Sequence, residues 1–223
     1  MRRKTVIVIL LLSALALSAL CLAACDRGSS EDDRPKDISR MVSAFYAGEC
    51  EDFAVTFERG SKEEPFIADG KTTSVVDFSS LRVIPLRATE VSEISFTLAG
   101  AAGESVSGKL TAGTFGEFRA EVAAEFAPVK VTLTAGELTR EIDLGDILSG
   151  CLSGYDAVEI ARREFASRSD AEGQEGEQTR EIFVKLITGD RTAYYYYVSF
   201  IGEGVDYWAV LLDPATGEVV SKR

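Results

Sequence analysis

The fold is decided by the stretch Glu181-Ile-Phe-Val-Lys-Leu-Ile-Thr188 and by the two runs after it, Ala193-Tyr-Tyr-Tyr-Tyr-Val-Ser-Phe-Ile201 and Val205-Asp-Tyr-Trp-Ala-Val-Leu-Leu212. These runs are rich in β-branched and aromatic residues and are separated by short glycine-containing turns, which predicts antiparallel strands. A further strand is expected from Glu218 to Ser221, after the turn Asp213-Pro-Ala-Thr-Gly217. The carboxyl-terminal segment therefore predicts a meander of three or four strands.

A helix is predicted just before this meander. Ser153-Gly-Tyr-Asp156 is a capping-box pattern, in which a serine and an acidic residue three positions later satisfy each other's backbone N–H groups. Val158, Ala161 and Phe165 then repeat at helical spacing. We therefore expect a helix at residues 156–166 that packs on the antiparallel sheet.

The region from Asp52 to Ile147 has a different pattern, with short alternating runs of apolar and polar residues separated by glycine-containing turns. About eight such runs follow one another, which is typical of a β-sandwich, and an immunoglobulin-like sandwich is one option. The segment Ser149-Gly-Cys-Leu-Ser-Gly154 marks the expected domain boundary. The sequence thus predicts an α+β, mainly β fold, with a β-sandwich at residues 49–150 and a small α+β domain at residues 151–223.

A short amphipathic helix is predicted at residues 37–48, ahead of the sandwich. Its apolar residues Ile38, Met41, Val42, Phe45 and Tyr46 fall at i, i+3, i+4, i+7 and i+8. An aspartate at the start and a glycine at the end are suited to cap and stop such a helix. We expect it to pack onto the domain that follows.

The amino terminus has the pattern of an export signal, because Arg2-Arg-Lys4 precedes an apolar run from Val6 to Leu20. A transmembrane anchor is the alternative, but it needs about 20 apolar residues and usually polar flanks on both sides. Leu22-Ala-Ala-Cys25 resembles the bacterial lipobox, whose cysteine receives a diacylglycerol thioether. The resemblance implies a signal peptide at residues 1–24, a lipid on Cys25 and a location on the extracytoplasmic face of the cell membrane.

Charge and composition limit the kinds of partner that the chain is expected to bind. Residues 25–36 offer no side chain for a core beyond the cysteine itself, so we expect a flexible tether there. Removal of the leader, which holds three basic residues and no acid, takes the net charge from −12 to −15. So acidic a chain has no electrostatic attraction to nucleic acid or to anionic lipid headgroups. The attached lipid is therefore the expected membrane contact.

The absence of histidine excludes many catalytic sites. Without it the chain has no Ser-His-Asp triad, no Cys-His dyad and no histidine-ligated metal. A Ser-Lys pair, a carboxylate pair or an oxygen-ligated calcium site is left, but none has a distinctive spacing here. We therefore expect no catalytic residues, no metal and no cofactor.

Cys50 and Cys151 are the cysteines that follow Cys25, and they bracket the β-rich region. A disulfide between them is permitted outside the cytoplasm and would stabilise the fold by about 4–5 kcal/mol in the loop-entropy model. Two separately buried free thiols are the alternative. Sequence spacing leaves both open, because it does not show contact.

The carboxyl-terminal segment is similar to a PepSY domain. The resemblance covers about the last 70 residues, the domain at residues 151–223, and is carried by the predicted helix, by Tyr196-Tyr-Val-Ser-Phe200 and by Trp208-Ala-Val-Leu-Leu-Asp-Pro-Ala-Thr-Gly-Glu-Val-Val220. PepSY domains occur in the propeptides of secreted thermolysin-type metalloproteases and in many bacterial envelope proteins. The resemblance implies peptide binding or restraint of a peptidase, and it brings no catalytic residues.

The tyrosine run is the sharpest local feature of this segment. Because successive side chains of a strand alternate between its faces, Tyr195 and Tyr197 share the face opposite Tyr194 and Tyr196. One face is expected to pack on the helix, and we predict that Tyr195, Tyr197 and Trp208 form a peptide-binding surface. Core packing and cross-strand pairing explain most of the run without a ligand and remain the alternative.

Three functions follow from these observations. The first is a non-catalytic lipoprotein that binds or restrains another envelope protein or peptide, with a peptidase as the partner that the PepSY resemblance implies. The second is a structural spacer or assembly subunit of an envelope complex. An enzyme that uses carboxylates alone is the least favoured, since nothing in the spacing of Asp and Glu marks an active site.

Overall fold

The computed structural model describes residues 35–87, 93–172, 180–202 and 207–223. The fold is α+β and mainly β, as predicted, with one helix in this part of the chain. The predicted signal peptide, Cys25 and the tether up to residue 34 lie outside the described residues. The elements are β1 (Ile38–Glu49), β2 (Phe53–Glu63), β3 (Val75–Pro85), β4 (Ile94–Gly100), β5 (Ser105–Ala112), β6 (Phe118–Glu121), β7 (Pro128–Ala135), β8 (Leu138–Asp143), β9 (Gly145–Asp146), α2 (Gly154–Glu172), β10 (Glu181–Thr188), β11 (Tyr194–Ile201), β12 (Tyr207–Leu212) and β13 (Val219–Lys222).

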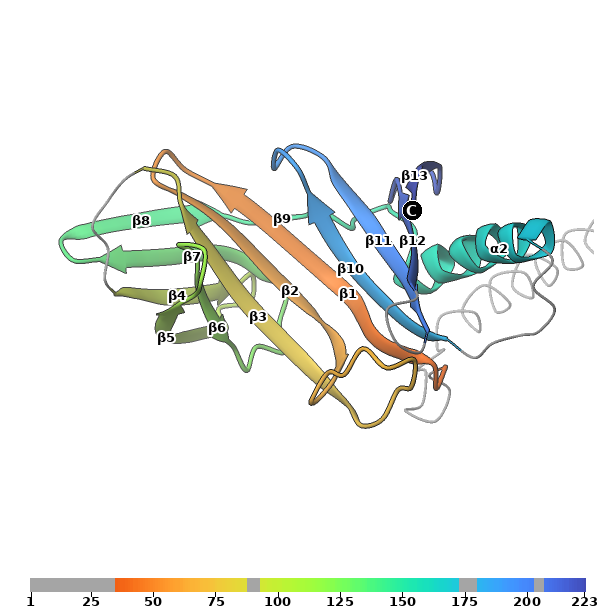
Figure 1. The fold of residues 1–223 in the computed structure, drawn as a ribbon. Coiled ribbons are helices and arrows are strands. Elements are labelled where there is room, and N and C mark those ends of the chain that lie inside the picture. The colour runs from red at the N-terminus through yellow and green to blue at the C-terminus, as the bar shows by residue number, and fades with distance from the viewer. Residues whose placement is uncertain (1–34, 88–92, 173–179, 203–206) are drawn as a thin grey trace, which may run out of the picture. The chain divides into compact units, whose positions relative to one another are not determined.

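The strands form one continuous sheet in the order β13-β12-β11-β10-β1-β2-β3-β6-β5-β4-β7-β8, with the short β9 beside β1. Neighbouring strands are antiparallel, except that β1 and β10 are parallel. Figure 1 shows β3, β2, β1, β10 and β11 side by side in the middle of this sheet. β1 therefore joins the amino-terminal hairpins to the carboxyl-terminal meander.

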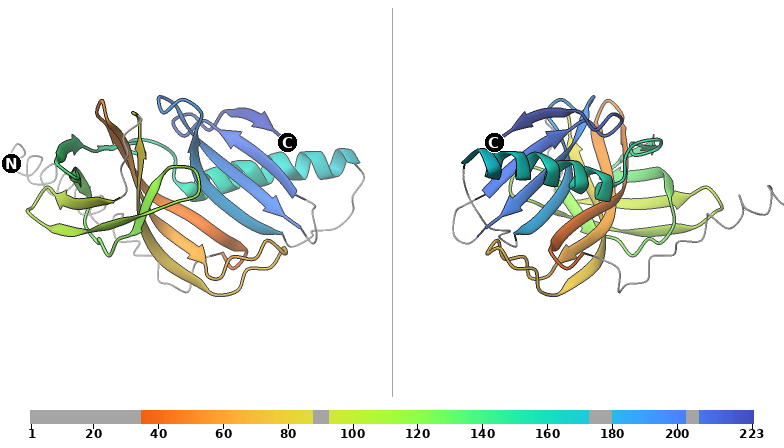
Figure 2. Two further views of the ribbon diagram at one scale, coloured as in Figure 1. Left: turned by 60° about the vertical axis from the view of Figure 1, so that its left-hand side comes forward. Right: turned by 90° about the vertical axis from the view of Figure 1, so that its right-hand side faces the viewer.

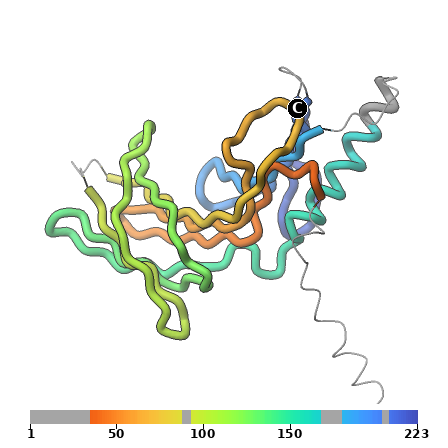
Figure 3. The backbone as a smooth tube through the Cα atoms, turned by 90° about the horizontal axis from the view of Figure 1, so that it is seen from below, coloured from red at the N-terminus to blue at the C-terminus, as the bar shows by residue number. Residues whose placement is uncertain are grey.

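Two hydrophobic cores are built on this sheet. The first lies where the sheet curls, between β2 and β3 on one side and β4, β7 and β8 on the other (Figure 3). The second lies between α2 and the strands β1, β10, β11 and β12 (Figure 2). Its fully buried side chains include Tyr196, Ile182 and Leu212.

β1 serves both cores, because adjacent residues of a strand point to opposite faces. Phe45 is buried in the second core, whereas Tyr46 packs against the first. The boundary predicted near Ser149–Gly154 separates the two cores along the sequence, but β1 bridges it. Residues 36–223 form one compact unit.

The prediction of a helix at residues 37–48 is wrong, because these residues form β1. Two irregularities explain the misleading spacing: the register with β10 shifts between Ile38 and Arg40, and the register with β2 shifts between Val42 and Ala44. A bulge displaces the period-two alternation, so apolar side chains three and four residues apart reach the same core. Gly60 permits this arrangement, since a Cβ there would lie 1.9 Å from the Met41 carbonyl oxygen.

The carboxyl-terminal segment follows the prediction closely. β10 has the predicted bounds, and α2 begins at the predicted capping box. The Ser153 amide donates to Asp156 Oδ2 at 3.0 Å, and the Asp156 amide donates to Ser153 Oγ at 3.2 Å. The Ser153 hydroxyl and amide together lower the pKa of the Asp156 carboxyl. Local capping thus fixes where α2 starts and how it approaches the sheet.

Candidate binding groove

The tyrosine run of β11 divides between the two faces of the sheet as predicted. Tyr196 is fully buried against α2, and its hydroxyl donates to the Leu152 carbonyl at 2.8 Å. Tyr194 is partly buried on the same face and its ring contacts Phe45. Tyr195 and Tyr197 lie on the opposite face and are half-buried.

Trp208 does not belong to a binding surface. It is only 3% exposed and lies in the second core, where its ring contacts those of Phe200 and Phe165. The Phe165 and Phe200 rings stack with centroids 4.9 Å apart. Its physical role is to fix α2 on the sheet, because Phe165 comes from the helix and the other two rings come from β11 and β12.

β10 has an unpaired edge. It pairs with β1 only through Ile182 and Phe183, and within the described ranges no other strand occupies that edge up to Thr188. The Ile182 amide donates to the Asp37 carbonyl at 2.7 Å, so Ile182 points its N–H toward β1. Because alternate residues of a strand turn their backbone groups to the same side, Val184, Leu186 and Thr188 present theirs to this edge.

A groove lies along this edge, between the β1–β2–β3 strands and the β10–β11 hairpin. It consists of a wide pocket of about 550 Å³ and a narrower one of about 440 Å³. The two are continuous, since both are lined by Thr56, Arg82, Thr188 and Tyr194. Volumes of this size are typical of ligand pockets.

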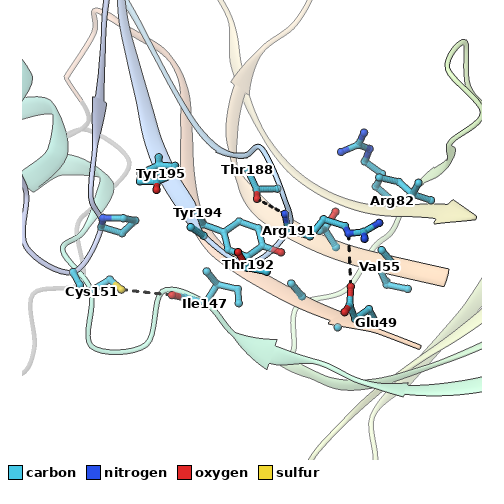
Figure 4. A pocket seen from close by; sticks show the side chains of 18 of the residues that line it. Glu49, Val55, Arg82, Ile147, Cys151, Thr188, Arg191, Thr192, Tyr194 and Tyr195 are labelled. Carbon is cyan, nitrogen blue, oxygen red and sulfur yellow. Dashed lines mark hydrogen bonds and ion pairs between the residues drawn. The ribbon is translucent and has the colours of Figure 1, made fainter. Parts of the chain in front are cut away.

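The wide pocket is mainly apolar, and its opening lies between the β10–β11 turn and the end of β1 (Figure 4). Arg191, in the β10–β11 turn, crosses the opening, and its Nε lies 3.7 Å from Glu49 Oε2. Both side chains are about half-exposed, so the pair contributes about 0–1 kcal/mol and does not lock the opening. Figure 4 shows Thr188, Thr192, Tyr194 and Tyr195 on the hairpin side, with Val55 and Arg82 across from them.

The narrow pocket is lined by cations, which is unusual in so acidic a chain. Arg40 Nη2 lies 2.9 Å from Glu58 Oε1. Arg82 and Arg119 share Glu117, at 2.5 and 2.7 Å. Burial alone would raise the pKa of Glu117, but the hydrogen bonds from Arg119 and Arg82 outweigh it and lower that pKa.

Lys185 is the remaining cation of this pocket. Its Nζ lies 5.3 Å from the centre of the Tyr197 ring and 5.8 Å from that of Phe183. No carboxylate in the described part of the chain forms an ion pair with it. Burial and the positive charge of Arg40 lower the pKa of Lys185, and Glu58 opposes them only in part.

A second polar cluster lies beneath the loop between β2 and β3. Glu63 Oε1 accepts hydrogen bonds from the amide and hydroxyl of Thr73, and Glu181 Oε2 accepts one from the Gly70 amide. Both glutamates are at least 97% buried, and each has one oxygen that lacks a partner among the described residues. Burial raises the pKa of Glu181, the Ser39 hydroxyl and the Gly70 amide oppose this, and the charge of Glu63 adds to the rise.

Of the two alternatives that the sequence leaves open, the structure has the second, because Cys50 and Cys151 are free thiols. Cys50 packs beside the first core, between β1 and β2. Cys151 lies near the start of α2, where its thiol donates to the Ile147 carbonyl at 3.5 Å. The two thiols thus have separate environments, as in the alternative interpretation.

Neither a metal site nor a membrane span is found in the described ranges. Their cysteine, aspartate and glutamate side chains form no group of three or more that could hold a metal ion. Their helix is too polar to cross a membrane. Cys25, the predicted lipid attachment site, lies outside these ranges.

No family model, curated protein or solved structure matches this chain. The lipobox and PepSY resemblances therefore stay predictions.

Sequence reasoning missed the groove residues. Arg40, Arg82 and Lys185 lie on three strands that are far apart in the chain, and each is flanked by ordinary strand residues. The parallel pairing of β1 with β10 brings them together. If residues 38–49 had been predicted as a strand, an incompletely paired edge between this strand and β10 could have been looked for.

Proposed function

We propose that this chain is a non-catalytic lipoprotein, anchored by Cys25 to the extracytoplasmic face of the cell membrane, whose groove binds an extended segment of another envelope protein or peptide. The observation that carries this proposal is the unpaired edge of β10, which opens into a groove large enough for a ligand. The leader, with its lipobox, supplies the location.

An extended segment is the ligand shape that best fits such an edge. A peptide laid against Val184–Thr188 would form main-chain hydrogen bonds with β10, as in recognition by strand addition. At about 3.3 Å per residue, these five positions span about 13 Å of strand. Side chains that alternate along the peptide would fall into the groove and onto its rim.

The proposal assigns a separate role to each half of the chain. We infer a PepSY-like domain at residues 151–223, supported by the packing of one helix on an antiparallel meander. We infer a β-sandwich at residues 49–150, supported by the core between facing strands. The sandwich serves as a rigid support for β1 and thus for one wall of the groove. The resemblance to PepSY makes a peptidase the first partner to test.

The binding role of the groove is tested by a substitution that places a bulky side chain in it. Thr56 lies at the junction of the two pockets, and Thr97 is an exposed residue of β4 outside the groove. Full-length tagged protein is used to capture partners from envelope extracts of the native cells. We expect wild type and Thr97→Trp to recover the same envelope protein, and Thr56→Trp to lose at least about 90% of it. Equal recovery by a folded Thr56→Trp variant would contradict the proposal.

The location is tested separately, by mass spectrometry of the mature amino terminus. The proposal requires chains that begin at Cys25 and carry acyl groups. Chains that retain the leader, or an unmodified Cys25, would refute the lipoprotein assignment.

A further inference from the structure

Among the described residues that line it, the narrow pocket holds more positive than negative charge. Arg40 and Lys185 both lie over the Phe183 ring, at 5.6 and 5.8 Å from its centre, and Glu58 is the carboxylate that pairs with Arg40. Two cations therefore share one anion in a half-buried site. The charge of Arg40 acts on Lys185, and neighbouring like charges are unfavourable unless another anion offsets them.

Two hydrogen-bond donors in this site have no hydrogen-bond partner among the described residues. Arg40 Nε is buried and unpartnered among the described residues, although Nη2 of the same side chain bonds Glu58. The Lys185 ammonium faces aromatic rings and the pocket. A buried donor such as Arg40 Nε is costly when left unsatisfied, and a charge-assisted bond to a carboxylate is among the strongest ways to satisfy it.

The position of Lys185 on β10 indicates where the missing anion comes from. Lys185 lies within the unpaired segment Val184–Thr188, and its side chain is on the face opposite the buried Val184 and Leu186. A strand added to this edge would place one of its side chains beside Lys185, since directly opposite residues have Cβ atoms about 5 Å apart. The residues before and after it would point to the apolar face.

We propose that Lys185 and Arg40 form an anion subsite that takes a glutamate or aspartate side chain of the segment bound along β10. This inference rests on the proposed function and narrows it to one ligand class, an extended segment in which acidic and apolar residues alternate. Arg82 and Arg119, farther along the pocket, add positive potential for further acidic residues of the same segment.

The test uses two peptides that differ only in charge, Ser-Val-Glu-Val-Glu-Val-Ser and Ser-Val-Gln-Val-Gln-Val-Ser, and free glutarate as a small dicarboxylate. Binding to the full mature chain in detergent is measured by calorimetry. The ammonium of Lys185 is followed by NMR in protein labelled with ¹³Cε-lysine. We expect the Glu peptide to bind at least about tenfold more tightly than the Gln peptide and to raise the pKa of Lys185.

Three variants keep the test specific. Lys185→Gln should abolish the preference for the Glu peptide, and Lys185→Arg should retain it. Lys109→Gln, which removes an exposed lysine of β5, is the matched control and should change nothing. Retention of the full preference by a folded Lys185→Gln variant would overturn the assignment of this residue.

The outcomes distinguish failure of the anion subsite from failure of the proposed binding function. Equal binding of the two peptides would overturn the acidic ligand class and leave groove binding intact. Binding of glutarate alone, with neither peptide bound, would overturn both the bound segment and its class. A Lys185 resonance that none of the three probes moves would overturn the anion subsite itself.

Discussion

Replacement of Tyr196 by Phe tests how α2 is attached to the sheet that forms one wall of the groove. The change removes one oxygen atom from a fully buried ring and leaves the ring contacts in place. What is lost is the hydrogen bond of 2.8 Å to the Leu152 carbonyl, just before α2. A typical net contribution is about 0.5–1.5 kcal/mol, and a carbonyl left without a partner adds to it. Because Leu152 is only partly buried, water can reach it, and we expect a loss of about 1–2 kcal/mol.

The loss is measured by urea denaturation. With a slope of about 2 kcal/mol/M, the midpoint should fall by about 0.5–1 M. Tyr195→Phe on the opposite face of the same strand is the control and should shift the midpoint by less than about 0.3 M. Burial raises the pKa of Tyr196 to about 12, so the neutral hydroxyl contributes fully below pH 10 and its contribution is lost as the pH rises toward 12. The difference between wild type and Tyr196→Phe should therefore narrow over that range. Equal midpoints for the two variants at pH 7 would refute this account of the attachment.

Three further substitutions test the cores and the buried acids. Trp208→Ala should cost about 3–5 kcal/mol in urea unfolding, because the indole fills the core between helix and sheet. Gly60→Ala should cost about 1–3 kcal/mol in the same assay, because its Cβ would overlap the Met41 carbonyl and disturb the bulge in β1. Glu181→Gln should raise the free energy of unfolding at pH 7 by about 1 kcal/mol, since the uncharged amide can donate to the unpartnered oxygen of Glu63. The advantage of the variant should vanish at about pH 4. Because burial raises the pKa of Glu181 in the folded state, the protonated carboxyl of wild type makes its full contribution to stability below pH 4.5, and this contribution is lost as the pH rises through the folded-state pKa.

Each of these outcomes has a clear opposite. A Trp208→Ala variant that keeps its stability and loses only partner binding would show that the tryptophan belongs to a binding surface. Gly189→Ala is the control for Gly60, since nothing lies within 4 Å of an added Cβ there, and equal costs for the two would exclude a specific close approach. A Glu181→Gln variant whose melting temperature follows that of wild type at every pH would show that this carboxyl is not perturbed.

The carboxyl-terminal elements could be predicted because their signals are local. The capping box at Ser153 depends on neighbours in sequence, and the alternation of the tyrosine run in β11 depends only on strand geometry. The burial of Trp208 could not be predicted, because it depends on where Phe165 of the helix lies. Local pattern thus gives the elements and their faces, and tertiary packing decides which aromatic residues are covered.

β1 shows the limit of pattern analysis. Two register shifts give it the apolar spacing of a helix, and the residue that permits the bulge, Gly60, lies on the next strand. The groove depends on the same strand, because it exists where the parallel pairing of β1 and β10 ends. Parallel pairing between residues about 140 positions apart leaves no mark in either segment, so Arg40 and Lys185 could not be brought together from sequence.

The central claim is that a ligand adds a strand to the free edge of β10, and backbone hydrogen exchange measures this directly. The amides of Val184, Leu186 and Thr188 face the unpaired edge, whereas those of Phe183, Lys185 and Ile187 face the neighbouring β11. With the acidic peptide bound, the account predicts that exchange slows selectively at the first three positions, by at least about tenfold. Unchanged exchange at these amides in the presence of bound peptide would contradict it.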